Sequence, residues 1–316
     1  MKIHTNITTY PKFIKPVITV GMFDGVHSGH QQILKKVVET AKTNKGESIV
    51  ITFDTHPRMV LNHEFHKLKF INSQDEKIEL IRATGVDHII ILPFTKEFSQ
   101  QSSSDFVINF LVKTLNINTL AVGYNNHFGN RENNNFDHIN ELAAEYNFDI
   151  IKTDVISIDN LKVSSTSIRD ALGNGDIVLA NKMLGYKYCL SGKVIEGNRI
   201  GNEIGFPTAN LDIENDFKLI PAMGVYAVEV EIDNTKYKGM LNIGIRPTLN
   251  INKLSIETHI FYFNKYIYGQ YIKLYLVERI RDEERFSSLA LLIEQLKKDK
   301  AAALDILVDK NENDFF

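Results

Sequence analysis

Residues 17–30 read VITVGMFDGVHSGH, in which a short, mostly apolar run stops at Gly21 and a turn with three glycines follows. The stretch predicts a buried strand, a tight turn and a helix, because apolar side chains recur beyond the turn at helical spacing, at Ile33, Leu34, Val37, Val38 and Ala41. Such a turn points backbone amides and the positive end of the helix dipole at one spot. That arrangement suits a phosphate chain, which the glycines allow to come close.

The same alternation continues through the first half of the chain. Apolar runs predict strands at 48–53, 88–92, 119–123 and 149–155, and helical spacing predicts helices at 77–81, 106–115 and 137–146. Strands separated by helices imply right-handed crossovers and a mostly parallel, Rossmann-like sheet of the α/β class. Ligands on such sheets bind beyond the carboxyl ends of the strands.

The pattern changes near residue 184. Strands are expected at 190–195, 225–232, 237–243, 255–263 and 271–277, with turn residues but no long helix between them. This favours an antiparallel sheet or small β-barrel. A helical run over 288–309 follows it. We therefore expect two domains, 1–184 and 185–316.

The composition excludes several classes of protein. A length of 316 residues with 24% charged side chains is typical of a folded two-domain chain, and a net charge of −3 gives no general attraction to nucleic acid. No apolar run reaches the ~18 residues of a membrane span, and a secretory signal is not expected. Cys189 is the single cysteine, so no intrachain disulfide forms and a cytoplasmic protein is expected. The oligomeric state is left open.

His27 and His30 lie at the predicted start of the first helix, three residues apart. Two imidazoles on one face can donate hydrogen bonds to phosphate oxygens and stabilise charge that builds up in a transition state. A zinc site is the alternative, but no cysteine accompanies the pair, and a closed site needs more ligands. A Walker A loop is absent from the sequence.

This stretch resembles the signature of the HxGH nucleotidylyltransferases, and its FDGVH form is similar to the flavin adenylyltransferase branch. Residues 52–58 (TFDTHPR) and 163–169 (VSSTSIR) resemble two further blocks of that branch, in the same order. The hydroxyl-rich 163–169 also opens a predicted helix and carries an arginine, so it could bind a triphosphate; a plain helix N-cap would explain one serine only. The resemblance implies catalytic roles for His27, His30 and Arg169 and nucleotide-binding roles for Gly21, Phe23, Asp24, Gly25, Gly29, Ser164, Ser165 and Thr166.

The flavin side of this site is expected in residues 123–129. They resemble the branch's flavin-binding loop, which implies FMN contacts for Asn125 and Phe128. Asn126 and His127 depart from the usual pattern of that loop.

A second constellation lies at residues 197–210, GNRIGNEIGFPTAN. Glycines at four-residue spacing (Gly197, Gly201 and Gly205) predict a loop that closes over a ligand, and Thr208 and Asn210 offer oxygen ligands suited to Mg²⁺. The string resembles the riboflavin kinase signature, although Asn202 stands where that family often has arginine. The resemblance implies ligand-binding roles for the three glycines, Phe206, Pro207 and Thr208, and a catalytic role for Asn210.

Glu257 is the candidate carboxylate of the second half. In a strand, Glu257, His259, Phe261 and Phe263 alternate onto one face, where an acid among aromatic side chains is unusual for a solvated surface. A paired structural glutamate is the alternative. The segment 256–261 resembles the riboflavin kinase strand that carries the catalytic carboxylate, and 224–228, 242–248 and 281–286 also match that family in order.

Together these blocks cover nearly the whole chain, which looks like a member of the bacterial bifunctional riboflavin kinase and FAD synthetase family. The resemblance implies that riboflavin and ATP give FMN in the second domain, and that FMN and ATP give FAD and pyrophosphate in the first, with Mg²⁺. Two alternatives stay open: a kinase that has lost FAD synthesis, and a flavin- or nucleotide-binding sensor without turnover.

Overall fold

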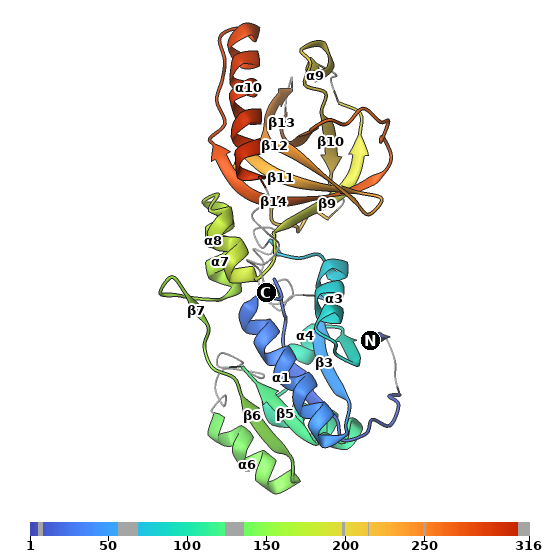
Figure 1. Cartoon of the computed structure of the whole chain (residues 1–316). Helices are drawn as coiled ribbons and strands as arrows, with labels where there is room; N and C mark the ends of the chain where they lie inside the picture. The colour runs from blue at the N-terminus through green and yellow to red at the C-terminus, as the bar shows by residue number, and fades with distance from the viewer. Residues whose placement is uncertain are drawn as a thin grey trace. The chain divides into compact units, whose positions relative to one another are not determined.

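The chain forms two compact units, Met1–Ser165 and Thr166–Phe316. We analysed a computed structural model (Figure 1), which describes residues 1–5, 9–55, 69–123, 136–197, 200–213, 215–248 and 251–308. The predicted boundary at 184/185 falls at the end of helix α8 (Ile177–Leu184) and stays a prediction, because packing divides the chain nineteen residues earlier.

The first unit contains a six-stranded sheet of order β1-β4-β3-β2-β5-β6, and every neighbouring pair is parallel. Its strands are β1 (Lys2–Thr5), β2 (Val17–Val20), β3 (Ser48–Phe53), β4 (His88–Leu92), β5 (Thr119–Val122) and β6 (Asp149–Lys152). The predicted parallel sheet is confirmed. The continuous apolar runs of β2 to β5 are explained by burial on both faces, whereas the polar edge strand β1 gave no such signal.

Helices connect these strands and cover the sheet. They are α1 (Ser28–Asn44), α3 (Gln74–Ala83), α4 (Lys96–Gln100), α5 (Ser103–Asp105), the π-helix η2 (Phe106–Thr114) and α6 (Phe136–Tyr146). The five apolar residues that predicted α1 are all buried. The helix expected at 106–115 is present, but it is wound as a π-helix, a form that apolar spacing does not distinguish from an α-helix.

The strand order fixes where a ligand would bind in the first unit. The chain moves from β2 outward to β3 and β4, and later places β5 on the other side of β2. The switch point of the sheet therefore lies between β2 and β5, and the turn that follows β2 stands at its carboxyl edge.

The second unit is a closed barrel of order β10-β13-β12-β11-β14-β9, with antiparallel neighbours throughout. Its elements are α7 (Ser165–Gly173), β9 (Cys189–Ile195), α9 (Ile200–Glu203), β10 (Ala209–Asp212), β11 (Gly224–Ile232), β12 (Thr235–Thr248), β13 (Ile251–Ile260), β14 (Tyr271–Arg281) and α10 (Leu289–Ile306). The expected barrel and terminal helix are confirmed, and α10 packs against β11, β12 and β14. The short strand β10 was not expected, because it directly follows a Gly-Pro loop.

Helices α7 and α8 are bonded to the barrel. The buried Asn181 amide donates to the Leu276 carbonyl at 2.9 Å, and its oxygen accepts from the Tyr188 amide at 2.7 Å. The Ala222 amide donates to the Leu172 carbonyl at 3.0 Å. A barrel without these two helices would leave several buried polar groups unpaired.

We therefore expect a fragment of residues 166–316 to unfold at a higher denaturant concentration than one of residues 185–316. Within the longer fragment, Asn181→Ala should cost about 1–3 kcal/mol of unfolding free energy, because it leaves two buried backbone groups without partners. Val178→Ala, at an exposed position of the same helix, is the control and should change little. Equal midpoints of the two fragments, measured by circular dichroism in a urea titration, would contradict this.

Candidate active sites

The turn after β2 adopts a conformation that ordinary residues avoid. The φ angles of Phe23, Gly25 and Val26 are 50°, 87° and 33°, and a β-branched residue at positive φ is a genuine outlier. Each such non-glycine residue costs about 1–3 kcal/mol and persists only where the surroundings hold it. The Gly21 amide anchors the start of the turn by donating to the Ile51 carbonyl at 3.0 Å.

Asp24 fixes the middle of this turn through its side chain and its backbone carbonyl. Its buried carboxylate accepts hydrogen bonds from the amides of Ile71 at 3.0 Å and Asn72 at 3.4 Å. Its backbone carbonyl accepts from the Ser165 hydroxyl at 2.8 Å. The structure thus places Asp24 and Ser165, two predicted nucleotide-binding residues, in contact with each other.

His27 and His30 form a stacked pair at the start of α1. Their ring centroids are 3.6 Å apart with an interplanar angle of 15°. His27 caps the helix, because its Nδ1 accepts the His30 amide at 3.3 Å. That bond requires the His27 proton on Nε2, so Nε2–H is left as the donor.

Burial keeps both rings uncharged at neutral pH. Desolvation lowers the pKa of His27 to about 4. Desolvation, with the charges of His27 and Lys77, holds the pKa of His30 well below its usual value. The buried Nδ1 of His30 has no hydrogen-bond partner within the part of the chain that the structure describes. The pair therefore offers neutral hydrogen-bond donors, and a bound polyphosphate would favour their protonation.

The remaining predicted residues of this site are placed as follows. Gly29 lies against the His27 ring, where a Cβ would come within 3.3 Å. Ser164 is half-buried just before α7, whereas Thr166 and Arg169 lie on α7 and belong to the second unit. Asn125 and Phe128 lie outside the described residues.

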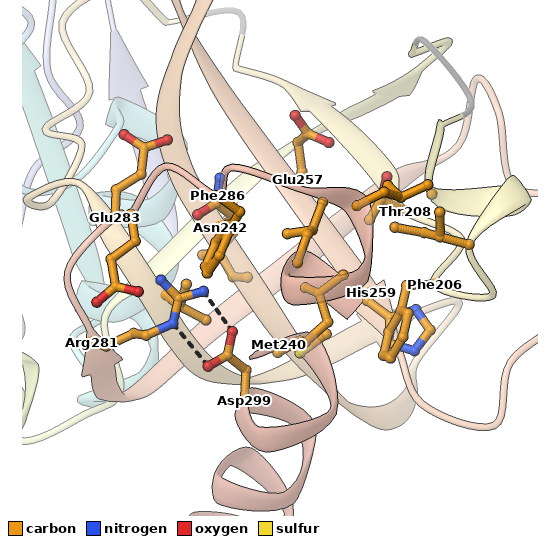
Figure 2. A pocket seen from close by; sticks show the side chains of 18 of the residues that line it. Phe206, Thr208, Met240, Asn242, Glu257, His259, Arg281, Glu283, Phe286 and Asp299 are labelled. Atoms are coloured by element: carbon orange, nitrogen blue, oxygen red, sulfur yellow. Dashed lines mark hydrogen bonds and ion pairs between the residues drawn. The ribbon is translucent and has the colours of Figure 1, made fainter. Parts of the chain in front are cut away.

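The second unit contains a cavity of about 640 Å³. Gly201, Phe206, Thr208, Asn210 and Glu257, which the sequence singled out, all line it. Figure 2 shows the Glu257 side chain between those of Asn242 and Thr208, with Phe206 and His259 together at one end. The cavity therefore gathers the predicted side chains from β10, β13 and the loop before β10.

Strand register explains this gathering. Asn210 of β10 pairs with Glu257 of β13, which pairs on its other side with Asn242 of β12. Val225 of β11 continues the row from Asn242 and pairs with Arg281 of β14. All five residues line the cavity, because side chains at paired positions lie on the same face of a sheet. Asn242 and Arg281 had no predicted role.

Two glycines allow the loop before β10 to close on itself. A Cβ at Gly197 would overlap the side-chain amide of Asn210, and one at Gly201 would overlap the Phe206 carbonyl. Gly205 has a φ of 81° and is exposed. His259 holds the same loop from β13, because its Nδ1 lies 2.8 Å from the Pro207 carbonyl and must donate to it. The loop therefore holds Thr208 in a fixed place next to Asn210 of β10.

A buried ion pair stabilises the wall of the cavity that β14 and α10 form. Arg281 donates from Nε and Nη2 to the two carboxylate oxygens of Asp299 on α10, at 2.9 and 2.7 Å, and Gln295 donates to the same carboxylate. Asp299 is only 1% exposed. These bonds hold the pKa of Arg281 above its usual value and fix α10 beside the segment that carries Glu283 and Phe286.

Comparison with known proteins assigns both units. The sequence pattern of FAD synthetase matches residues 11–167, and that of riboflavin kinase matches residues 184–307. Proteins named bifunctional riboflavin kinase/FMN adenylyltransferase are similar over about nine-tenths of this chain. The relative from Buchnera aphidicola subsp. Schizaphis graminum is 36% identical over 89% of this chain and 91% of its own, and the Escherichia coli K12 relative is 33% identical over 91% of each. The chain belongs to this bifunctional family.

One solved structure has the same fold as this family member. It is described as a macrolide-efflux protein from Streptococcus pneumoniae, with a TM-score of 0.87 and 29% identity over 96% of this chain and 99% of its own. Among the residues described here, no helix is long and apolar enough to cross a membrane.

The donor atoms of the cavity fit a magnesium ion that is shared with a nucleotide. Thr208 and Asn210 supply neutral oxygens, and within the described ranges no group of three or more His, Cys, Asp or Glu side chains could hold a metal. Mg²⁺ typically keeps several waters and binds through few protein ligands together with phosphates. The residues therefore suit such an ion rather than a protein cage.

Gly197→Ala should displace the Asn210 amide and lower riboflavin phosphorylation by about 10²-fold, the cost typical of small misplacements in active sites. Gly173→Ala is the matched control, because a Cβ there meets no atom within 4 Å. Steady-state assays of FMN formation by both variants test this. Normal turnover by Gly197→Ala would show that the position of Asn210 does not matter.

Proposed function

We propose that this family member makes FAD in two steps, phosphorylating riboflavin in the barrel and adenylylating the resulting FMN at the turn after β2. The observation that carries the proposal is the row from Asn210 through Glu257 to Asn242, which places a carboxylate between two amides inside one cavity. A cytoplasmic location is part of the proposal, supported by a sequence with a single cysteine.

The first step requires an alcohol to attack the γ-phosphorus of ATP. The oxygen of the riboflavin 5′-hydroxyl forms the new bond to the γ-phosphorus while the bond between that phosphorus and ADP breaks. Glu257 accepts the proton that the hydroxyl loses. Asn210 and Thr208 orient the phosphates, and bound Mg²⁺ would neutralise their charge. The apolar side chains of the cavity, among them Phe206 and Met240, exclude water from the transferring phosphoryl group.

The second step requires no dedicated base, because the FMN phosphate is already an anion. One of its oxygens attacks the α-phosphorus of ATP, and pyrophosphate leaves. His27 donates from Nε2, and His30, the turn amides and the hydroxyls of Ser164 and Thr166 stabilise the developing charge together with Arg169. Asn125 and Phe128 are proposed to contact the flavin.

Glu257→Gln should lower FMN formation about 10²–10⁴-fold, because the amide cannot accept the proton. FAD formation from added FMN should persist in this variant. Glu278→Gln is the control, since this half-buried glutamate of β14 is not among the residues lining the cavity. Near-normal turnover of Glu257→Gln would assign Glu257 a structural role.

His30→Ala should show the reverse pattern, losing FAD formation while keeping riboflavin phosphorylation. Chromatography of the products from riboflavin, ATP and Mg²⁺ measures both steps in one reaction. Wild-type protein that accumulates FMN without FAD would favour the kinase-only alternative, and wild-type protein that makes neither product would favour the sensor.

Mg²⁺ alone should bind the protein weakly, because Thr208 and Asn210 are only two neutral ligands. Calorimetry should show strong uptake only when a nucleotide such as ADP is present. Tight binding of Mg²⁺ without nucleotide would contradict the assignment of a shared ion.

A further inference from the structure

Lys77 is a buried lysine to which the two reactions above assign no role. It lies on α3, and its side chain is 6% exposed, although lysines are almost never buried without partners. Its Nζ donates to the Phe53 carbonyl at 3.1 Å, the Thr52 hydroxyl at 3.2 Å and the Met22 carbonyl at 3.5 Å. The three donors of the ammonium therefore all point at the carboxyl ends of β2 and β3.

These three acceptors carry no charge, so they do not neutralise the ammonium. The Thr52 hydroxyl also donates to the Met22 carbonyl at 3.2 Å, so the ends of the two strands and α3 share one hydrogen-bond network. Asp24 and Asp54 attract the ammonium electrostatically, and the Asp24 carboxylate also accepts the Ile71 and Asn72 amides. The ammonium is thereby held at the ends of β2 and β3, where two carboxylates favour its charged form.

Lys77 contacts the residue that directly precedes the strained residues of that turn. Met22, whose carbonyl it binds, directly precedes Phe23, the first residue at positive φ. Asp24, the next residue, is tied to the segment just before α3. That helix is itself anchored, because Ser73 and Glu76 form a reciprocal capping box at its start. The strained turn is thus held to α3 on both sides of Phe23.

We propose that Lys77 is a positioning residue of the adenylyl-transfer site, which holds the turn in its phosphate-binding conformation and adds a fixed positive charge beneath the triphosphate. The inference rests on the placement of FMN adenylylation at this turn. It adds a cation to a site in which His27 and His30 are neutral. Lys77 does not touch the reacting atoms, and it acts through the turn and through its charge.

The charge of Lys77 gives the inference a distinctive pH dependence. Burial lowers the pKa of Lys77 to about 8, although Asp24 and Asp54 act in the opposite direction. The neighbouring histidines titrate far below this pH. As the pH rises through about 8, the free enzyme loses the ammonium, so kcat/KM for ATP in FAD formation should fall.

The test compares Lys77→Met, which removes the charge and keeps an apolar stem, with Lys77→Arg, which keeps a charge that does not titrate. Lys36→Met, at an exposed position of α1, is the control. Each full-length variant is assayed for FAD formation from FMN and for riboflavin phosphorylation, from about pH 6 to pH 10, to span the titration of the lysine.

We expect Lys77→Met to lower kcat/KM for FAD formation about 10–100-fold, with riboflavin phosphorylation and the control unchanged. The fall near pH 8 should disappear in Lys77→Arg. Normal FAD formation by Lys77→Met, or a fall that persists in Lys77→Arg, would overturn the inference. If Lys77→Met loses both activities, it has misfolded, and the wild-type and Lys77→Arg profiles decide instead. A wild-type protein that makes no FAD would refute the proposed function, independently of any variant.

Discussion

The hydrogen-bond register of the two sheets determines where each functional group can lie. In the barrel, strand pairing aligns one row of side chains from Asn210 to Arg281, so five adjacent strands contribute to the cavity, and the loop before β10 and the segment after β14 complete it. In the parallel sheet, the order of the strands places the turn after β2 at the switch point. A slip of one residue in any barrel strand would turn its functional side chain to the opposite face.

The two candidate sites use different electrostatics for related phosphate chemistry. The barrel cavity contains acidic side chains, including Glu257 and Glu283, and its arginine is already paired with Asp299. Such a cavity favours a nucleotide that brings its own cation. The turn after β2 combines a helix N-terminus with neutral imidazoles and a buried ammonium, so it favours an anion directly.

Much of this organisation could be predicted from the sequence. The alternation of apolar runs and helical spacing predicted the parallel sheet, because both faces of its central strands are covered. The spacing of glycines and oxygen ligands indicated Thr208 and Asn210. The alternating face of 257–263 left a structural role open for Glu257, and the resemblance of 256–261 to the riboflavin kinase strand singled it out. Each of these signals comes from residues that are close in the sequence. Such signals predict the fold correctly where the local preference of a whole element agrees with the global structure.

The placement of Asn242, Arg281 and Lys77 could not be predicted in this way. Asn242 and Arg281 gain meaning only from strand pairing, which joins residues that are distant in the sequence. Lys77 precedes Ile78 and Glu79 in an amphipathic helix, where a charged residue is normally taken as solvent-exposed. Its burial depends on contacts with the ends of β2 and β3, which are distant in the sequence. The positive φ of Val26 likewise contradicts its local preference, and such exceptions are expected at functional sites.

The hydroxyl-rich segment 163–169 is divided by the packing of the chain. Ser165, which binds the Asp24 carbonyl, closes the first unit, and Thr166 and Arg169 open the second. Recombination between relatives at this boundary, between Ser165 and Thr166, would therefore combine half of the motif from one parent with half from the other. Chimeric enzymes, whether natural or engineered, should tolerate crossovers between α8 and β9 better than crossovers between Ser165 and Thr166. A crossover between α8 and β9 leaves all of residues 163–169 from one parent.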